Sequence, residues 1–392
     1  MDRPDDIMLP ARTTWLSDAA VQSVCGAVGS GGDPVYFVGG CVRDALLGVE
    51  GSDVDLSTPL HPEEVTARAE AAGLKVVHTG IEHGTVTVVA DGKGYEVTSF
   101  RRDVQTDGRR AVVAFSADIA EDARRRDFTL NALYATPEGQ VLDPLGGLPD
   151  CLNRRIRFIE DAATRIREDY LRILRFFRFH AWYAETDAGF DPDALDAIAA
   201  NADGLETLSA ERVGSEIIKL LGAPDPAPAM AVMRQTGCLV RILPGSDDRF
   251  LAPVIYLETM VGLVPDPLLR LAALGGTDLA KRLRLSRAQA QRLEAFMAVA
   301  YSATPLAELS YRQGADIALA AAVLRAAMGE REVATSEIGS INHAAHQAFP
   351  VTAADLMPDY QGRNLGDKLN QLEQRWIASG FTLTREDLVT GL

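Results

Sequence analysis

A short polar segment near the N-terminus carries the residue types that bind phosphate. Gly39-Gly40-x-x-Arg43-Asp44 directly follows an apolar run at 35–38. Two glycines between a strand and a helix let the backbone approach a ligand closely, and the helix N-terminus then offers free N–H groups to an anion. Arg43, one turn into the helix, adds a charge-assisted contact. We therefore predict that Gly39, Gly40 and Arg43 bind the phosphates of a nucleotide.

Two aspartates follow this segment at a spacing that suits a divalent cation. Asp53 and Asp55 are two residues apart at the start of a strand predicted over 54–57, so both carboxylates are expected to project from the same face. Carboxylates beside a phosphate site are typical Mg²⁺ ligands. Alone, an Asp-x-Asp pair is more often two solvated aspartates than a metal site, but its position just after the Gly-Gly segment favours metal binding. Neither a Walker loop nor a dinucleotide-binding fingerprint is present.

A third acidic residue, Glu96, lies within the apolar strand predicted over 95–100. A carboxylate inside an apolar strand is unfavourable unless it has a hydrogen-bonding or charged partner or a functional role. As a metal ligand or a general base, Glu96 would serve in-line phosphoryl transfer to a hydroxyl. An edge-strand glutamate that faces water is the alternative. We include Glu96 with Asp53 and Asp55 as a catalytic candidate. It would act as a metal ligand, as a general base or as a structural residue.

A basic turn supplies a second group of candidate ligands. The segment 124–132 reads Arg-Arg-Arg-Asp-Phe-Thr-Leu-Asn-Ala. Clustered guanidiniums suit a triphosphate because each offers a planar fork to phosphate oxygens. Asp127 and Asn131 can hydrogen-bond a ribose. We predict nucleotide contacts by Arg126, Asp127 and Asn131, with a solvated basic turn as the alternative.

A third motif combines acidic and basic residues on a helix predicted over 161–183. Asp169 and Arg172 share one face of that helix, and Arg175 and Arg178 roughly follow it. A salt-bridged surface helix is the usual outcome of such a charge run. A carboxylate beside a guanidinium also matches the amino donor and ring acceptor of cytosine and adenine. Uracil and guanine present the reversed pattern and would leave both protein groups mispaired.

The elements around these motifs change character along the chain. Helices are predicted over 14–30, 41–48 and 61–72, strands over 35–38, 54–57, 75–79, 85–89 and 95–100, and an irregular, mobile loop over 101–124. Strand patterns end near 142, and helical spacing follows over 161–183, 189–201 and 209–222 and continues to the C-terminus. This pattern predicts an α/β head of about 148 residues followed by an all-helical remainder.

Composition limits the classes of protein to consider. The 392 residues carry a net charge of −16, which is unfavourable for long, nonspecific nucleic-acid binding. Residues 101–180 nevertheless hold fifteen Arg and no Lys against thirteen Asp and Glu, so a locally cationic surface can bind a small RNA. No apolar stretch reaches the length of a membrane span, and no secretory signal is visible. Four scattered cysteines argue against zinc and favour a reducing cytoplasm.

The three motifs, in this order, resemble those of the class II tRNA nucleotidyltransferases, or CCA-adding enzymes, and of the related bacterial poly(A) polymerases. The resemblance is strong over residues 35–220 and weaker at the C-terminus, where the spacing from Gly362 to Trp376 is similar to that of some tail helices. It implies an α+β fold: a nucleotidyltransferase head with a small mixed sheet flanked by helices, then a helical neck, body and tail. The implied domains are 1–148, 149–222 and 223–392.

The resemblance also implies roles for the candidate residues. Asp53 and Asp55 would bind two catalytic Mg²⁺ ions, and Arg126 and Asp127 would contact phosphate and ribose. Asp169 and Arg172 would read the edge of the incoming base. Arg175 and Arg178 complete the expected nucleotide-binding set, and 101–124 corresponds to a flexible loop that serves the switch from C to A.

The resulting expectation is an enzyme that adds C, C and A to the 3′ end of tRNA from CTP and ATP. No membrane association and no stable protein partner are expected. A bacterial poly(A) polymerase is the alternative enzyme, but such enzymes tend to have Pro where this chain has Tyr170, and a long basic tail. A non-catalytic nucleotide- or RNA-binding protein is the remote alternative.

Overall fold

The computed structural model describes residues 7–51, 53–78, 80–81, 84–107, 110–185 and 189–390, with the backbone alone for 103–113. The chain divides into two compact units. One contains residues 1–209 with 235–241, and the other contains residues 210–234 with 242–392. The predicted domain boundaries at 148 and 222 stay predictions.

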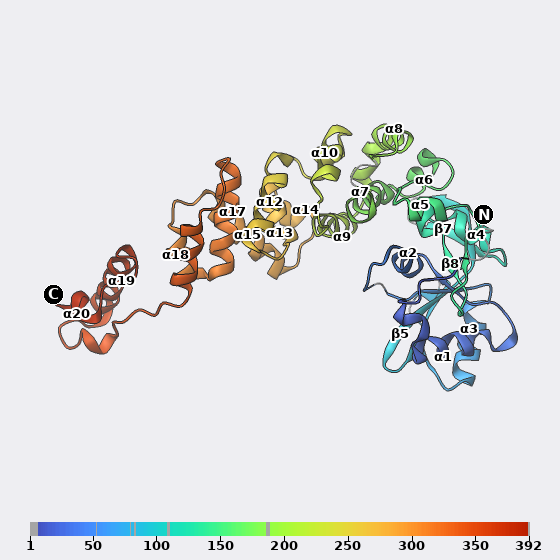
Figure 1. Cartoon of the computed structure of the whole chain (residues 1–392), viewed down its shortest axis with the longest axis horizontal. Helices are drawn as coiled ribbons and strands as arrows, with labels where there is room; N and C mark the ends of the chain where they lie inside the picture. Colours follow the sequence, from blue (N-terminus) through green and yellow to red (C-terminus); the bar gives the residue numbers. More distant parts are fainter. Residues whose placement is uncertain are drawn as a thin grey trace. The chain divides into compact units, whose positions relative to one another are not determined.

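A seven-stranded mixed sheet forms the centre of the first unit (Figure 1). Its strands follow the order β3-β4-β5-β2-β1-β8-β9. The strands are β1 (Tyr36–Val38), β2 (Leu56–Thr58), β3 (Lys75–Val77), β4 (Thr85–Ala90), β5 (Lys93–Ser99), β8 (Tyr134–Ala135) and β9 (Val141–Leu142). Only the β2–β5 pair is parallel among the described pairings, and the others are antiparallel. The mixed sheet expected from the sequence is therefore confirmed.

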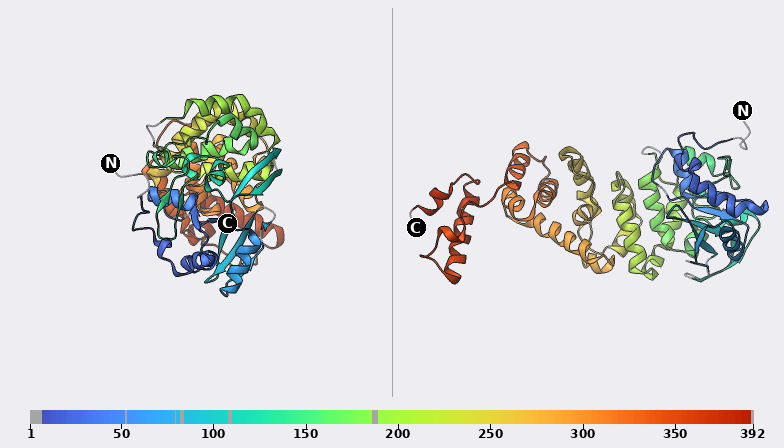
Figure 2. Two further views of the ribbon diagram at one scale, coloured as in Figure 1. Left: turned by 90° about the vertical axis from the view of Figure 1, so that its right-hand side faces the viewer. Right: turned by 90° about the horizontal axis from the view of Figure 1, so that it is seen from below.

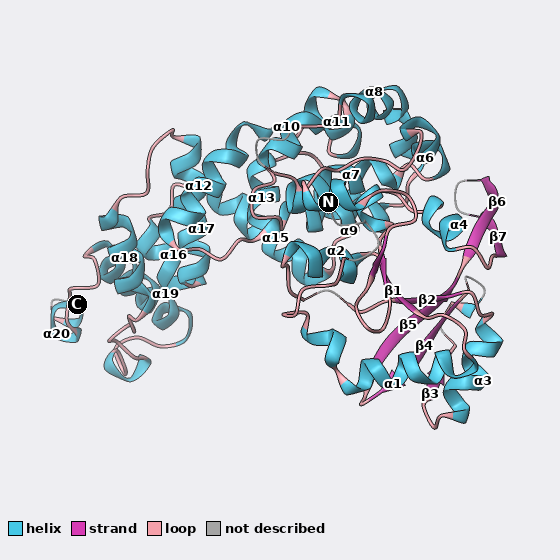
Figure 3. Cartoon of the chain, turned by 45° about the vertical axis from the view of Figure 1, so that its right-hand side comes forward, coloured by secondary structure: helices cyan, strands magenta, loops and turns pink. Residues whose placement is uncertain are grey.

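Helices α1 (Ala19–Val28) and α3 (Pro62–Ala71) cover one face of this sheet (Figure 3). Apolar side chains alternate along β4 and β5, where Val86, Val88, Tyr95 and Val97 are buried. Successive side chains on a strand point to opposite faces, so their neighbours point to the other, more open face. Glu96 is one of these exposed neighbours.

The predicted irregular loop over 101–124 is wrong. The backbone forms an antiparallel hairpin of β6 (Arg101–Asp107) and β7 (Arg110–Phe115), separate from the seven-stranded sheet (Figure 3). Helix α4 (Ile119–Arg124) follows it. The dipeptide at 107–108 is Asp-Gly, which is typical of tight hairpin turns and was the available signal. Residues 108–109 lie outside the described part of the chain.

The predicted single helix over 161–183 is also wrong. The chain forms α6 (Ala162–Glu168) and α7 (Leu171–Tyr183), and Asp169 between them has an extended backbone with φ −153° and ψ 104°. The Asp169 carboxylate accepts the amide of Leu171 at 3.1 Å, as side chains do at helix N-termini. The other helical segments of this unit are α2 (Gly40–Leu47), α5 (Leu148–Leu152), α8 (Pro192–Asn201) and the 3₁₀ segments η2 (Thr14–Ser17), η3 (Gly29–Gly31), η5 (Thr129–Asn131) and η6 (Ala202–Thr207).

The second unit is helical throughout its described residues (Figure 2). Its segments are α9 (Ala210–Leu221), η7 (Asp248–Phe250), α12 (Leu251–Val261), α13 (Pro267–Leu274), α14 (Leu279–Arg282), α15 (Arg287–Tyr301), α16 (Leu306–Gln313), α17 (Ala315–Met328), α18 (Thr335–Ala345), η8 (Ala353–Asp355), α19 (Gly362–Ala378) and α20 (Arg385–Val389). Helices α10 (Ala227–Gln235) and α11 (Cys238–Ile242) span the points where the chain passes between the units. Near the C-terminus, buried Leu372 and Trp376 of α19 pack with Phe381 in an apolar cluster. The helical remainder expected from the sequence is confirmed.

The close approach of α9 to the segment after α14 gives a test of packing in the second unit. A Cβ atom at Gly214 would lie 1.9 Å from the carbonyl oxygen of Leu283, whereas one at Gly339 of α18 would meet nothing within 4 Å. We expect Gly214→Ala to lower the free energy of unfolding by about 2 kcal/mol or more. Gly339→Ala should raise it by roughly 0.5–1 kcal/mol because alanine favours a helix. Urea denaturation measures both, and wild-type stability of Gly214→Ala would contradict this packing.

Among the described residues, no helix is both long and apolar enough to cross a membrane.

Candidate active site

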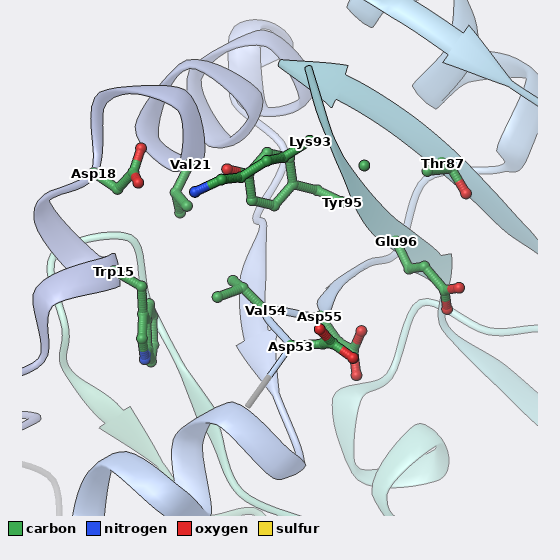
Figure 4. A pocket seen from close by; sticks show the side chains of 11 residues that line it. Trp15, Asp18, Val21, Asp53, Val54, Asp55, Thr87, Lys93, Tyr95 and Glu96 are labelled. Carbon is green, nitrogen blue, oxygen red and sulfur yellow. The ribbon is translucent and has the colours of Figure 1, made fainter. Parts of the chain in front are cut away.

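The two aspartates lie where the chain enters β2, one to three residues before the strand begins. Asp53 is exposed and Asp55 is partly buried, and Figure 4 shows their carboxylates close together. The carbonyl of Asp55 accepts the amide of Val38 in β1 at 3.0 Å, which fixes its backbone against the sheet. The predicted strand over 54–57 is shifted, since β2 starts at Leu56. The carboxylates of Asp53 and Asp55 still lie on the same side of the backbone, as their spacing in the sequence predicted.

Glu96 joins these aspartates from the neighbouring strand. In the parallel pairing of β2 with β5, Leu56 lies opposite Val97, so the preceding residues Asp55 and Glu96 are neighbours. Strand β5 has β4 on its other side, so the edge-strand alternative for Glu96 is wrong. The three carboxylates line one pocket with a volume of about 800 Å³, to which Trp15 also contributes (Figure 4).

The electrostatics of this cluster favour a cation. Burial, with the negative charge of Glu96 and a smaller contribution from Asp53, raises the pKa of Asp55 to about 6, while Arg126 opposes the shift. Like charges held together disfavour ionisation, and a divalent cation removes that penalty. No group of three His, Cys, Asp or Glu residues in the described part of the chain is arranged to enclose a metal. Magnesium commonly takes one or two carboxylates and completes its shell with water and substrate phosphates, so the donor set fits.

The predicted phosphate site has the expected backbone geometry. Helix α2 begins at Gly40, and Gly39 before it adopts φ 70°, a conformation that glycine enters without a steric penalty. A Cβ atom at Gly39 would lie 3.0 Å from Nη1 of Arg126. The missing side chain therefore lets the Arg126 guanidinium lie against the turn, and the same guanidinium is close enough to Asp55 to lower its pKa.

Arg43 does not lie as the direct phosphate contact that the sequence predicted. It is 5% exposed, and its guanidinium donates to Asp44, to Oδ1 of Asn131 at 2.6 Å and to the Tyr183 hydroxyl at 2.8 Å. It also lies over the rings of Phe179 and Tyr183. The hydrogen-bond donors of Arg43 are therefore engaged by other side chains of the protein, and its bond to Tyr183 links α2 to α7. Tyr183 carried no sequence signal because it is 140 residues away.

Asp127 and Asn131 belong to the same hydrogen-bonded group. Asp127 is 7% exposed and accepts from the Asn131 amide at 2.9 Å, from its neighbouring amide, and from Nε of Arg175 at 2.6 Å. Arg175 and Arg178 each lie over the ring of Phe179. Arg175 and Asn131 therefore hold Asp127 in place, and the predicted ribose contacts stay proposals.

The prediction that Asp169 and Arg172 share one face of a continuous helix is wrong, because the helix is interrupted between α6 and α7. Arg172 instead donates to Oε2 of Glu168 at 2.6 Å and to the carbonyl oxygens of Arg165 and Arg125, each at 2.9 Å. Glu168 also pairs with Arg165. Glu168 was not among the predicted site residues, so its contact with Arg172 was missed.

Comparisons with known proteins identify the family of this chain. Residues 35–157 match the family model for the poly(A) polymerase head domain, and residues 189–250 match a probable RNA- and SrmB-binding site of polymerase A. The mitochondrial CCA tRNA nucleotidyltransferase 1 of Danio rerio is 31% identical over 91% of this chain and 86% of its own length. The chain belongs to the class II CCA-adding enzyme and poly(A) polymerase family.

Other members of this family extend the comparison. The CCA-adding enzyme of Geobacillus stearothermophilus is 42% identical over 55% of this chain and 52% of its own length. The crystal structure of the Bacillus stearothermophilus CCA-adding enzyme in complex with CTP superimposes with a TM-score of 0.69 and 28% identity, over 92% of this chain and 94% of that chain. The family expected from the sequence motifs is confirmed, as is its fold.

Proposed function

We propose that this chain is a template-independent nucleotidyltransferase that adds C, C and A to the 3′ end of tRNA from CTP and ATP. The observation that carries the proposal is the position of Arg126, which lies against the Gly39 turn and near Asp55. A guanidinium, which can bind phosphate, thus lies close both to a helix N-terminus and to Asp55. That arrangement suits transfer of a nucleotidyl group. The relatives named as CCA-adding enzymes support the choice of acceptor and nucleotides.

In the reaction, the tRNA 3′-hydroxyl oxygen forms a bond to the α-phosphorus of the nucleotide, the bond to the bridging oxygen breaks, and pyrophosphate leaves. Asp53 and Asp55 would hold Mg²⁺, which when bound stabilises charge on the phosphates and the attacking oxygen. Arg126 and the N-terminus of α2 would bind the triphosphate. Glu96, beside Asp55, is placed to complete the ligand set or to accept the hydroxyl proton.

Selection of the base would fall to the segment at the break between α6 and α7. We propose that Asp169, at the break, and Arg172, in the first turn of α7, read the Watson–Crick edge of the incoming base. Glu168 and the carbonyl of Arg125 hold the guanidinium of Arg172, which limits its orientations. A constrained guanidinium discriminates bases better than a free one because little conformational entropy is lost on binding.

The second unit would bind tRNA, with recognition of duplex RNA through its backbone and 2′-hydroxyls. We also propose a cytoplasmic location. All four cysteines are free thiols and all are buried, as is usual for a reducing compartment.

A nucleotide-by-nucleotide assay tests the proposal. A tRNA that lacks its CCA end is incubated with CTP alone, with ATP alone, or with both, and products are resolved at single-nucleotide length. We expect two additions with CTP alone and a third only when ATP is also present. The matching poly(A) polymerase head model makes polyadenylation the second candidate. Long A tracts without C would establish that candidate and overturn ours.

A further inference from the structure

A buried carboxylate outside the proposed ligand set makes the closest contacts to Arg126. Asp122 of α4 has a fully buried side chain. Its Oδ2 accepts from Nη2 of Arg126 at 3.2 Å and from the Tyr134 hydroxyl at 2.7 Å. Nε of Arg126 in turn donates to the Tyr134 oxygen at 3.3 Å. These three side chains close a small ring of hydrogen bonds.

The other oxygen of Asp122 serves different donors. Its Oδ1 accepts from Nε of Arg125 at 2.8 Å and from the Arg101 amide, the first of β6, at 3.4 Å. The two oxygens of Asp122 thus have different hydrogen-bond partners. One faces Arg126 and Tyr134, and the other faces the base of the hairpin. Burial alone would raise the pKa of Asp122, but the positive charges of Arg126 and Arg125 lower it, so the group is an anion.

The turn that carries Arg126 is also held from its other side. The carbonyl of Arg124 accepts from Nη1 of Arg165 at 2.8 Å, and that of Arg125 accepts from Arg172 at 2.9 Å. These carbonyls end α4, where backbone oxygens lack helical partners and attract cations. The backbone at Arg126 is therefore fixed by the base-selecting segment, whereas its guanidinium is oriented by Asp122 and Tyr134.

We propose that Asp122, assisted by Tyr134, is a positioning residue that holds the Arg126 guanidinium between the Gly39 turn and Asp55 and thereby sets the affinity for the nucleotide. Two of the three guanidinium nitrogens are engaged by Asp122 and Tyr134, while Nη1 faces Gly39. A long arginine side chain otherwise spreads over many rotamers, so prior orientation strengthens its contact with phosphate. This inference rests on the proposed function, because it treats Arg126 as a phosphate ligand.

A double-mutant cycle tests the inference. Asp122→Asn keeps an oxygen for Arg125 and the Arg101 amide but places an NH₂ group against Arg126. We expect the Kd for CTP, measured by calorimetry on the full chain with Mg²⁺, to rise about ten-fold, with KM following it and kcat changing less. In an Arg126→Ala background the same substitution should add less than about two-fold, because its target is gone.

Two further variants keep the test falsifiable if Asp122→Asn unfolds. Tyr134→Phe removes one hydroxyl from the ring and should raise the Kd for CTP by about three-fold, again without a further effect beside Arg126→Ala. Arg125→Ala removes a partner of the other oxygen and should leave the Kd within about two-fold. Independent, multiplying effects of Asp122→Asn and Arg126→Ala would overturn the inference. Failure of the wild type to bind CTP or extend tRNA would instead overturn the proposed function.

Discussion

Replacing Asp53 or Asp55 by asparagine is expected to reduce addition of CMP to tRNA by roughly 10³-fold or more. Asparagine preserves side-chain size but removes the negative charge that attracts Mg²⁺. Because Asp55 lies beside Glu96 and is partly buried, its loss removes a ligand that cannot be replaced by a flexible surface group. Single-turnover extension of a tRNA lacking its CCA end measures the effect.

Glu70→Gln is the matched control for that experiment. Glu70 is an exposed carboxylate on α3, away from the pocket residues, and its replacement removes one charge from the same unit. We expect activity within about two-fold of wild type. Thermal unfolding of all three variants separates loss of the fold from loss of chemistry. Substantial activity in both aspartate variants, in folded protein, would rule out these residues as the metal ligands.

Replacing Arg172 by alanine is expected to relax nucleotide selection. The ratio of kcat/KM for CTP to that for UTP should fall by roughly 10- to 100-fold, because mispaired buried groups no longer penalise the wrong base. The Kd for tRNA should not change, since Arg172 contacts Glu168 and backbone carbonyls in the first unit. Misincorporation of UMP and GMP, scored nucleotide by nucleotide, measures the change.

Arg167→Ala is the control for this substitution. Arg167 is exposed on the same short helix α6 and donates to Oγ1 of Thr164 at 3.3 Å. Its replacement by alanine removes an identical charge five residues from Arg172 and leaves Glu168 and the Arg125 carbonyl unchanged. Selection should remain at the wild-type level in this variant. Equal rejection of UTP and GTP by Arg172→Ala and by wild type would contradict a base-reading role.

Local spacing was sufficient to predict that the two carboxylates lie close together and that a glycine turn opens helix α2. Both depend on neighbouring residues: Asp53 and Asp55 are two residues apart just before β2, and Gly39 has a positive φ, which glycine adopts without strain. Apolar periodicity also indicated the strands of the head and the helical remainder, whereas the mixed sheet was implied by the family resemblance. The position of Glu96 opposite Asp55 depends on strand pairing, so the sequence could suggest the residue but not its neighbour.

Features set by distant contacts could not be predicted in the same way. Arg43 looks like a phosphate ligand in sequence, yet Tyr183 and Asn131 bind it in the folded chain. The break at Asp169 has no Gly or Pro to mark it, because a side-chain hydrogen bond to the Leu171 amide starts the next helix. Asp122 lies in the segment that the sequence predicted as an irregular loop, and only packing shows that it is buried against Arg126.

Sequencing the 3′ ends made when all four ribonucleoside triphosphates are present tests the central claim most directly. A tRNA lacking its CCA end is incubated with the wild-type chain and Mg²⁺, with Asp53→Asn as the inactive control. The proposed arrangement of carboxylates, Arg126 and the base-selecting segment predicts one dominant product that ends in CCA, and no extension by the variant. Tracts of A, incorporation of U or G at the levels of C and A, or equal extension by the variant would contradict it.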